Sequence, residues 1–431
     1  MKKLKKIVLV FCVFLSSFLV FLIPFGAHTQ GIDSRFGINA FVSGRYEQQE
    51  LDKPISVMKD MGIGFSREEF VWGSIEPEKG FFKWSAYDKS TDMLSSSGIS
   101  ILGVLDYSAP WATEDPYRDG ADKYMPNITD WQSYVGKVVD RYKSKVRYWQ
   151  IWNEPNVATF FKPEPNASQY LEILKSAYEI IKKEDSSAQV VVAGTSGVDA
   201  GYLRELERLG AADYFDILAV HPYSFDFYSP PESGFLDDMK NAERLAEELG
   251  NKPIWLTEFG WPTDDKNGLN EDLQAKYLTR TYLLSYQFSD VKKLFWYDLR
   301  NDGNDKEDRE NNFGLINKDY TKKESYYAYK NLISVLNGSQ FISASINNEN
   351  GFLNFYFIKG DSKIRVVWNV KKESTVILDD SLGNLKVLDL IGNGVIPQYK
   401  NKSISINVSD SPIFIIEDKK LKNQETEKLR N

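Results

Sequence analysis

Residues 32–336 alternate short apolar runs with longer amphipathic segments, and this alternation limits the possible fold more than any other feature of the chain. The pattern is typical of β/α units arranged around a parallel sheet. The apolar runs predict eight strands, at residues 36–40, 64–67, 99–105, 147–151, 189–193, 217–220, 253–256 and 293–297. Eight such units in about 300 residues predict an α/β fold of the TIM (β/α)8 barrel type.

The segments between these runs carry apolar residues at helical spacing. Trp131, Tyr134, Val135, Val138 and Val139 recur as the buried face of a helix does. A doubly wound open sheet is the alternative to a barrel. It is disfavoured because no Gly-x-Gly-x-x-Gly follows the first predicted strand and no Gly-Lys-Ser/Thr phosphate loop is present.

The pattern changes after residue 337, where apolar runs follow one another without helical segments. The runs at residues 352–358, 364–368, 374–378, 385–390, 404–408 and 412–416 predict six antiparallel strands. We therefore expect a barrel at residues 31–337 and a small antiparallel β-sandwich domain at 338–418. Residues 419–431 are rich in Lys, Glu, Gln and Asn and predict a disordered tail.

The first 30 residues have the pattern of an export signal. Lysines at the start are followed by an apolar run at residues 7–23 and then by Pro24. Cleavage as a signal peptide is favoured, and an uncleaved N-terminal membrane anchor is the alternative, because the run just reaches the length of a short span. Either form predicts an extracytoplasmic location for the rest of the chain.

Composition excludes several classes of chemistry. The one cysteine, Cys12, lies in the leader, so no disulfide can form within the chain. Only two histidines occur, which disfavours a zinc site. The net charge of −8 disfavours a nucleic-acid partner. We expect no metal and no cofactor, and the oligomeric state stays open.

Polar and aromatic residues follow the predicted strands, at the end of the barrel where functional side chains gather. The candidates are Arg67 after the second strand, Asp106, Tyr107 and Trp111 after the third, Asn153 and Glu154 after the fourth, His221 and Tyr223 after the sixth, Glu258 and Trp261 after the seventh, and Trp296 on the eighth. Trp111 and Trp261 could stack on sugars or fill the core.

Glu154 and Glu258 close strands that are three β/α units apart. Two carboxyl groups that meet across a barrel mouth are the minimal equipment for glycoside hydrolysis, because one protonates the leaving oxygen and the other attacks the sugar or activates water. Arg67 and the Tyr223 hydroxyl could keep the attacking carboxylate ionised. Taken singly, either glutamate could instead form a salt bridge at the barrel rim.

The ordered set of motifs resembles the retaining glycoside hydrolases of the large clan of (β/α)8 barrels that carry the acid/base on strand four and the nucleophile on strand seven. Family 39 is the most similar, followed by family 5. The resemblance covers about residues 33–336 and rests on Trp152-Asn153-Glu154-Pro155-Asn156, His221-Pro222-Tyr223, Trp255-Leu256-Thr257-Glu258-Phe259-Gly260-Trp261 and Phe295-Trp296-Tyr297.

The resemblance implies roles for individual residues. Glu154 would be the general acid/base, Glu258 the nucleophile and Asn153 the partner of the sugar 2-hydroxyl. The resemblance further implies that Arg67, His221 and Tyr223 orient the nucleophile and the sugar, and that Trp296 forms the floor of the sugar site. Asp106-Tyr107 stands where family 5 often has a histidine, so family 39 fits better.

The sequence thus predicts an exported retaining β-glycoside hydrolase that cleaves a polysaccharide or oligosaccharide through a covalent glycosyl-enzyme intermediate. A carbohydrate-binding or scaffold protein and a transglycosylase on the same barrel are the alternatives. A serine esterase is disfavoured because Gly194-Thr195-Ser196-Gly197-Val198 lacks the closing glycine of the nucleophile elbow. Sugar, linkage, and endo or exo action are not predicted.

Overall fold

The computed structural model describes residues 34–224, 226–266, 268–379 and 384–418. The predicted leader, with its apolar run at 7–23, and the predicted tail at 419–431 lie outside these described residues. Among the described helices, none combines the length and the hydropathy needed to span a membrane.

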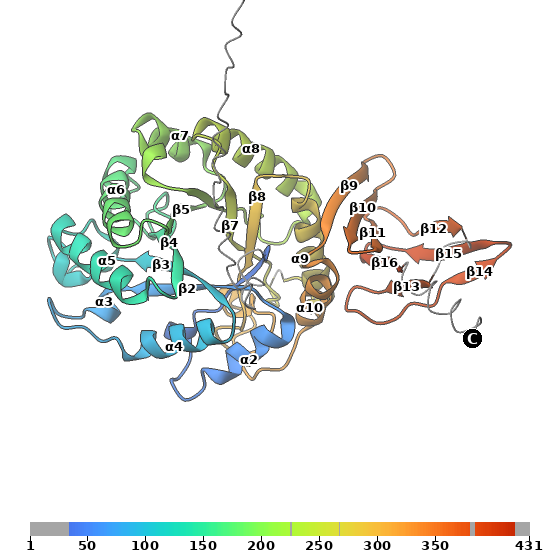
Figure 1. Ribbon diagram of the computed structural model, residues 1–431, viewed down its shortest axis with the longest axis horizontal. Coiled ribbons are helices and arrows are strands. Elements are labelled where there is room, and N and C mark those ends of the chain that lie inside the picture. The colour runs from blue at the N-terminus through green and yellow to red at the C-terminus, as the bar shows by residue number, and fades with distance from the viewer. Residues whose placement is uncertain (1–33, 225, 267, 380–383, 419–431) are drawn as a thin grey trace, which may run out of the picture.

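Eight parallel strands close into a barrel in chain order, which confirms the predicted fold class (Figure 1). Strand β1 pairs with both β2 and β8, so the ring has no open edge. The strands are β1 (Phe36–Asn39), β2 (Phe65–Val71), β3 (Ser100–Asp106), β4 (Val146–Ile151), β5 (Gln189–Ser196), β6 (Ile217–His221), β7 (Ile254–Phe259) and β8 (Val291–Trp296).

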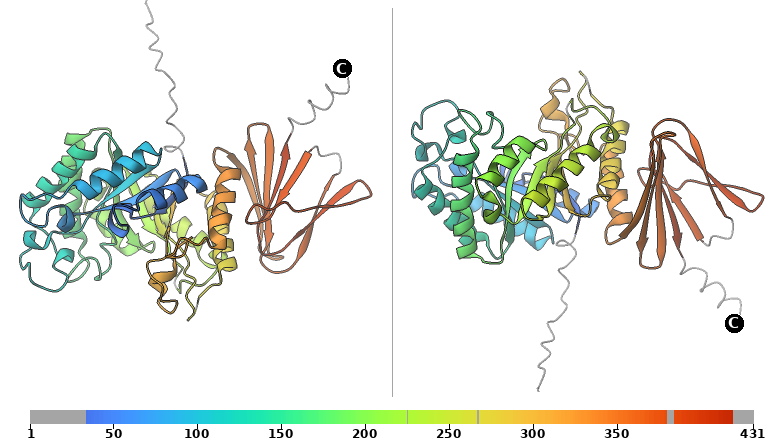
Figure 2. Two further views of the ribbon diagram at one scale, coloured as in Figure 1. Left: turned by 90° about the horizontal axis from the view of Figure 1, so that it is seen from below. Right: turned by 90° about the horizontal axis from the view of Figure 1, so that it is seen from above.

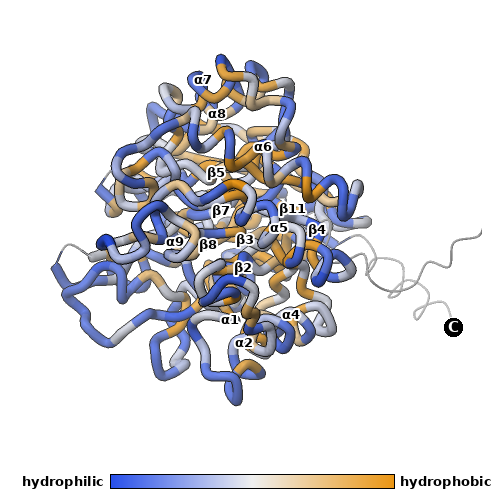
Figure 3. Tube along the Cα trace, turned by 90° about the vertical axis from the view of Figure 1, so that its left-hand side faces the viewer, coloured by the Kyte–Doolittle hydropathy of each residue, from blue (hydrophilic) through white to orange (hydrophobic). Residues whose placement is uncertain are grey.

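Helices surround the barrel. They are α1 (Val42–Arg45), α2 (Asp52–Met61), α3 (Trp72–Ile75), α4 (Ser85–Ser96), α5 (Ile128–Tyr142), α6 (Ala167–Glu184), α7 (Ala200–Arg208), α8 (Phe235–Glu248), α9 (Glu271–Ser285) and α10 (Glu324–Leu336). Asn127, Asn166, Asp199 and Asn270 each cap a helix by accepting a hydrogen bond from a backbone N–H of its first turn. The predicted apolar stripe of α5 is buried, as its spacing requires. In Figure 3 hydrophobic residues concentrate on the strands, while many of the surrounding loops are hydrophilic.

The interior of the barrel is apolar in its lower part. Side chains alternate between the two faces of a strand, so every second residue points inward. The inward residues form one cluster, which contains Phe65, Leu102, Val191, Ile217, Ala219, Trp255 and Phe295. The outward residues of the same strands pack against the helices. The barrel is therefore filled below its mouth, and only its upper end can bind a ligand.

Strand β2 is longer than the sequence predicted. We expected it to end at Arg67, because Arg67, Glu68 and Glu69 interrupt the apolar pattern, yet it continues to Val71. A charged residue need not end a strand at a barrel mouth, since inward side chains there face a polar site. Arg67 therefore projects from within the strand.

A β domain follows the barrel, and its described residues form eight strands in two antiparallel sheets, of the predicted sandwich type (Figure 2). The five-stranded sheet has the order β13 (Asn384–Leu388), β16 (Ile413–Asp418), β11 (Ser362–Asn369), β10 (Phe352–Lys359) and β9 (Gln340–Asn347). The three-stranded sheet has the order β12 (Ser374–Asp379), β15 (Ser403–Val408) and β14 (Gln398–Lys400).

The prediction of six strands missed β9 and β14. Strand β9 is an edge strand with mostly exposed side chains, and the short alternation of Ile342, Ala344 and Ile346 with polar residues was overlooked. Strand β14 has only three residues. The β domain packs on the outer side of the barrel helices. Tyr286, which follows α9, packs against Phe341 and Phe357, and Arg280 of α9 donates to the Asp410 carbonyl.

Candidate active site

Polar side chains form a layer directly above the apolar cluster of the barrel. On β2, Arg67 follows Phe65 by two residues, so both side chains face inward. On β6, His221 follows Ala219 in the same way. Arg67 and His221 are fully buried, and a buried charge requires partners.

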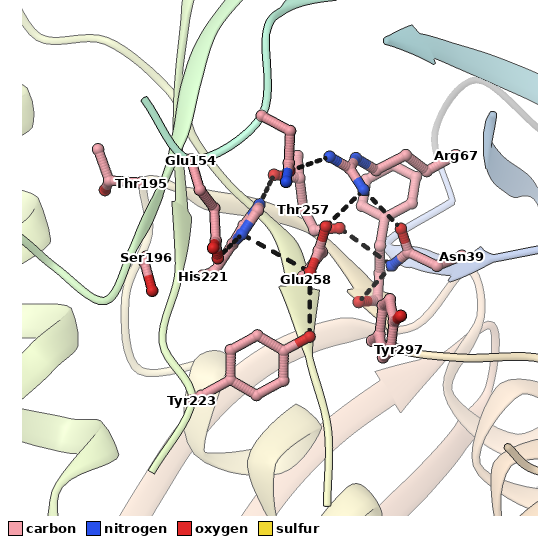
Figure 4. Close-up of polar contacts among 12 residues, drawn as sticks. Asn39, Arg67, Glu154, Thr195, Ser196, His221, Tyr223, Thr257, Glu258 and Tyr297 are labelled. Carbon is pink, nitrogen blue, oxygen red and sulfur yellow. Dashed lines mark hydrogen bonds and ion pairs between the residues drawn. The ribbon is translucent and has the colours of Figure 1, made fainter. Parts of the chain in front are cut away.

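Glu258 lies near the end of β7 and is held by two donors. Arg67 Nη1 lies 2.6 Å from Oε1, and the Tyr223 hydroxyl donates to Oε2 over 3.1 Å (Figure 4). Burial by itself raises the pKa of Glu258, but the positive charges of His221 and Arg67 and the hydrogen bonds to the carboxylate outweigh it and lower that pKa. The carboxylate is thus kept ionised and fixed in orientation, as a nucleophile requires.

Arg67 connects Glu258 to residues on or directly after two other strands, β1 and β4. Its Nη1 donates to Asn39 Oδ1 over 3.0 Å, its Nε to Gln150 Oε1 over 3.2 Å, and its Nη2 to Asn153 Oδ1 over 2.8 Å. The guanidinium is planar and cannot lose its proton in a protein, so these bonds define one orientation. Arg67 therefore positions Glu258 and Asn153 relative to each other.

Glu154 follows β4 in a left-handed backbone conformation. Its φ is 46°, and that of Trp152 is 66°. Such angles are costly for residues with a Cβ and persist where surrounding contacts hold them, often at functional sites. Here His221 Nδ1 lies 2.8 Å from Glu154 Oε1, and His221 Nε2 lies 2.9 Å from Thr257 Oγ1. His221 thus links the Glu154 carboxyl to the strand that carries Glu258.

The two predicted catalytic carboxyl groups meet at the barrel mouth. A carboxylate oxygen of Glu154 and one of Glu258 lie within 4.8 Å of each other, and a nitrogen of His221 lies within the same distance of both. A pair of carboxyl groups about 5 to 5.5 Å apart can act on one sugar carbon from two sides, whereas about 6.5 to 9.5 Å leaves room for an intervening water. The geometry has the shorter spacing.

Glu154, His221 and Glu258 also form the one group of three potential metal ligands that lie this close together in the described residues. Arg67 bonds directly to Glu258, and its positive charge would repel a metal cation at that carboxylate. His221 is engaged through both ring nitrogens. The donor set therefore suits proton transfer and nucleophilic attack better than metal binding.

Asn153 and Tyr107 join the site, but Asp106 is buried in the wall of the barrel mouth. Asn153 Nδ2 donates to the Tyr107 hydroxyl over 3.2 Å, so Tyr107 lies beside the predicted partner of the 2-hydroxyl. Asp106 is 0% exposed, and neither of its carboxylate oxygens has a hydrogen-bond partner among the described residues. The expectation that Asp106 contacts sugar is therefore wrong for this conformation, because no surface of its side chain is accessible.

Trp296 and Trp261 are also too buried to stack on a sugar. They are 0% and 3% exposed, and their rings stack on each other. Trp296 lies on the outer face of β8, because its neighbour Phe295 points into the barrel. The prediction that Trp296 forms the floor of the sugar site is wrong, as is the stacking prediction for Trp261. Trp111 is partly exposed, and its role stays a prediction.

Tyr297 occupies the place expected for Trp296. It is partly exposed, and it lies near Glu258 and Tyr223 in Figure 4. Its hydroxyl accepts a hydrogen bond from Arg45 Nη2 over 3.1 Å. Tyr297 offers an aromatic ring at the site, and Arg45 fixes its position.

Sequence reasoning gave no site role to several members of the polar layer, namely Asn39, Gln150, Thr257 and Tyr297, although Thr257 and Tyr297 stand in the motifs that carry the resemblance. All of them lie on or directly after a strand, and strand alternation could have found them. Tyr297 shares the inner face with Phe295, and Gln150 shares it with Tyr148, which packs on the interior cluster. An apolar residue that points into the barrel predicts that the residue two positions later along the strand also points inward, and this signal was not used.

Two protein-family models match parts of this chain. The family model described as "Glycosyl hydrolase catalytic core" matches residues 107–351, a range that contains both Glu154 and Glu258. A second model, described as "Beta-galactosidase", matches residues 41–110.

Curated relatives include two proteins named beta-xylosidase. The one from Caldicellulosiruptor saccharolyticus is 27% identical over 247 residues, which are 50% of this chain and 49% of that protein. The one from Geobacillus stearothermophilus is 22% identical over 250 residues, or 51% of this chain and 48% of that protein. The chain thus spans about half the length of these relatives.

Solved structures share the fold over most of the chain. A family 39 glycoside hydrolase from Bacteroides cellulosilyticus has a TM-score of 0.75 at 21% identity, covering 89% of this chain and 81% of its own. A GH39 beta-xylosidase from Caulobacter crescentus has a TM-score of 0.66 at 16% identity, covering 91% of this chain and 98% of its own.

Proposed function

Because the chain belongs to the glycosyl hydrolase catalytic core family, we propose that it hydrolyses β-glycosidic bonds with retention of configuration at the sugar. The observation that carries this proposal is the spacing of Glu154 and Glu258, whose nearest oxygens lie within 4.8 Å. That spacing favours direct attack by a carboxylate over attack by an intervening water.

The proposed reaction has two steps. In the first, Glu258 attacks the anomeric carbon while Glu154 donates a proton to the leaving oxygen, so that a covalent glycosyl-enzyme forms. In the second, Glu154 takes a proton from water, and the water replaces Glu258 at the same carbon. Arg67 and Tyr223 bond to separate oxygens of Glu258, which supports an ionised nucleophile at the start of each cycle.

Neighbouring groups support the charge changes of these steps. His221 hydrogen-bonds to Glu154, so it can hold that carboxyl group in position while Glu154 gives up its proton and takes one back. Asn153 is held between Arg67 and Tyr107, where its amide suits the sugar 2-hydroxyl, a contact that strengthens in the transition state. The reaction requires no cofactor.

A β-linked polysaccharide or oligosaccharide is the proposed substrate. The names of the relatives, which include beta-xylosidases and a glucosidase, support a β-linked sugar as the target. A cavity of about 810 Å³ lies between the loops that follow β7 and β8, but neither Glu154 nor Glu258 lines it, so it does not define the substrate. The predicted leader supports action outside the cytoplasm, by a secreted or membrane-anchored enzyme.

The test is an assay of the purified protein on a panel of aryl β-glycosides and β-linked polysaccharides that includes neutral and uronic-acid members. We expect Glu154→Gln and Glu258→Gln each to lower turnover by about four orders of magnitude or more with folding retained. Glu172→Gln, on the exposed face of α6, is the matched control and should keep wild-type turnover.

A 2-deoxy-2-fluoro glycoside should trap the glycosyl-enzyme, and mass spectrometry of peptides should find the label on Glu258. Near-normal turnover in either glutamine variant would contradict the proposal. Binding of a β-glycan without release of any sugar by the wild-type protein would favour a carbohydrate-binding protein instead.

A further inference from the structure

Glu69 is a third carboxylate at the barrel mouth, and the proposed reaction does not use it. It follows Arg67 by two residues on β2, so it shares the inner face and lies one step nearer to the mouth. Its side chain is partly exposed, unlike that of Arg67. Arg67, two residues before it on this face, bonds to Glu258, so Glu69 lies on the wall of the mouth next to the nucleophile. Burial raises the pKa of Glu69, and the positive charges of Arg67 and Arg45 act to lower it.

Glu69 has no ion-pair or hydrogen-bond partner for its side chain among the described residues, although cations are near. Each of these cations is engaged elsewhere. Arg67 bonds to Glu258, and Arg45 bonds to Asp298 and to Asp302. The carboxylate of Glu69 is therefore an acceptor that the protein itself leaves available.

Lys123, the remaining cation, is also engaged. Its Nζ lies 3.1 Å from Asp122 Oδ2 and 3.0 Å from the centre of the Tyr107 ring. A lysine held against an aromatic face and a carboxylate gains little from a further anion. Among the described residues, the three cations nearest to Glu69, namely Arg67, Arg45 and Lys123, are thus all engaged and do not favour an acidic sugar.

Asp106 adds a second carboxyl group behind Glu69. In the parallel pairing of β2 and β3, Asp106 lies opposite Val71, two residues beyond Glu69 on the same inner face. Asp106 is fully buried, and both of its oxygens lack partners. Burial raises the pKa of Asp106, and the neighbouring Glu69 raises it further. Asp106 and Glu69 thus place two carboxyl groups on one wall of the mouth, and the raised pKa favours the protonated form of the buried one.

We propose that Glu69 is a sugar-binding residue that accepts hydrogen bonds from the hydroxyl groups of the ring seated over Glu258, and that it makes the site select uncharged sugars over uronic acids. An ionised carboxylate accepts strong hydrogen bonds from hydroxyl groups and repels the carboxylate of a uronate. This inference rests on the proposed function, because it names the class of substrate for the same site.

The experiment compares Glu69→Gln with the wild type and with Glu172→Gln on the neutral and uronic-acid members of the panel. In the wild type we expect cleavage of a neutral substrate and at least about 100-fold lower kcat/KM for its uronate counterpart. We expect Glu69→Gln to lower kcat/KM on the neutral substrate about 10- to 100-fold and to narrow the neutral-to-uronate ratio at least tenfold. Glu69→Asp, which keeps the charge, should restore part of the selectivity.

The outcomes separate this inference from the function on which it rests. An active wild type whose selectivity is unchanged in Glu69→Gln, or one that prefers uronates, would overturn the inference alone. A wild type that cleaves no member of the panel would overturn the proposed function, and the inference would fall with it. Thermal unfolding of each variant should match the wild type, so that a change in selectivity reflects binding.

Discussion

Two layers of side chains fill the barrel, and they differ although the same strands supply both. The lower layer is an apolar cluster with Phe65, Ala219, Trp255 and Phe295 as members. The upper layer begins two residues further along these strands, at Arg67, His221, Thr257 and Tyr297. Alternation gives both layers the same orientation, and only height along the barrel separates them.

The difference between the layers indicates how the site is held in place. Buried charges are costly unless they are paired, and in the upper layer the guanidinium of Arg67 is paired with Glu258 and with three amide oxygens. The lower layer closes the barrel beneath these groups with close-packed side chains. The polar groups can therefore be fixed in one geometry while remaining open to a ligand from above.

Among substitutions in the two layers of the barrel, removal of Arg67 should have the largest effect on activity and stability. We expect Arg67→Met to lower kcat/KM about 100- to 1,000-fold, because Glu258 loses a hydrogen bond and the charge that lowers its pKa. The free energy of unfolding should fall by about 3 to 5 kcal/mol, since a buried carboxylate is left without its cation. Steady-state kinetics across pH and urea unfolding measure both effects. The acidic limb of the pH profile of kcat/KM should move to higher pH, because the pKa of Glu258 rises.

Phe65→Leu, one step below on the same strand and face, is the matched control for Arg67→Met. It should cost about 1 to 2 kcal/mol of stability while kcat/KM stays within a few-fold of wild type. An equal loss of activity in both variants would mean that the two layers do not act separately.

The sequence was sufficient to place the two glutamates, and the reason is physical. A strand that ends in a carboxylate at a barrel mouth is recognisable, because the apolar pattern stops where solvent begins. The structure brings Glu154 and Glu258 together from strands that are three units apart, as a closed ring of eight strands requires. Arg67 also reaches the site, although β2 runs four residues past it.

Features that depend on a single residue of register, or on weak patterns, could not be predicted. Trp296 and Tyr297 are both aromatic and adjacent, and only the inward direction of Phe295 separates the buried ring from the one at the site. Asp106 ends β3 and Glu154 follows β4, yet Asp106 is completely buried, and the position at a strand end alone did not show this difference. Strand β9 was missed because its apolar alternation is short and includes the weakly apolar Ala344.

Which of the two rings, Tyr297 or Trp296, lies at the sugar site can be tested, and the expected effect on kcat/KM is intermediate in size. We expect Tyr297→Ala to lower kcat/KM about 10- to 100-fold, because the ring lies at the site and Arg45 positions it. Trp296→Phe should keep kcat/KM within about threefold and lower stability by about 1 to 3 kcal/mol through a cavity on the outer face of β8. Kinetics and thermal unfolding of the pair distinguish the two roles. A larger activity loss in Trp296→Phe would reverse the assignment.

The smallest effect is expected where the same kind of ion pair lies outside the barrel. Asp60 bonds to Lys330 and to the Tyr326 hydroxyl, and these contacts lower its pKa to about 2. Since the Asp60 side chain is 45% exposed, solvent screens the pair, and Asp60→Asn should cost only about 0.5 to 1 kcal/mol at pH 7. The lowered pKa means that this stability is present above about pH 4 and is lost as the pH falls towards 2.

Urea unfolding of wild type and Asp60→Asn at pH 7, at pH 3 and in 1 M NaCl should therefore show a difference that shrinks with acid and with salt. The pair of Arg67 and Glu258 is buried, so its contribution should be much less sensitive to salt. If Asp60→Asn lowered the free energy of unfolding as much as Arg67→Met, burial would not explain the difference in stability between the two ion pairs. The cost would then have to come from the way Asp60 joins α2 to α10.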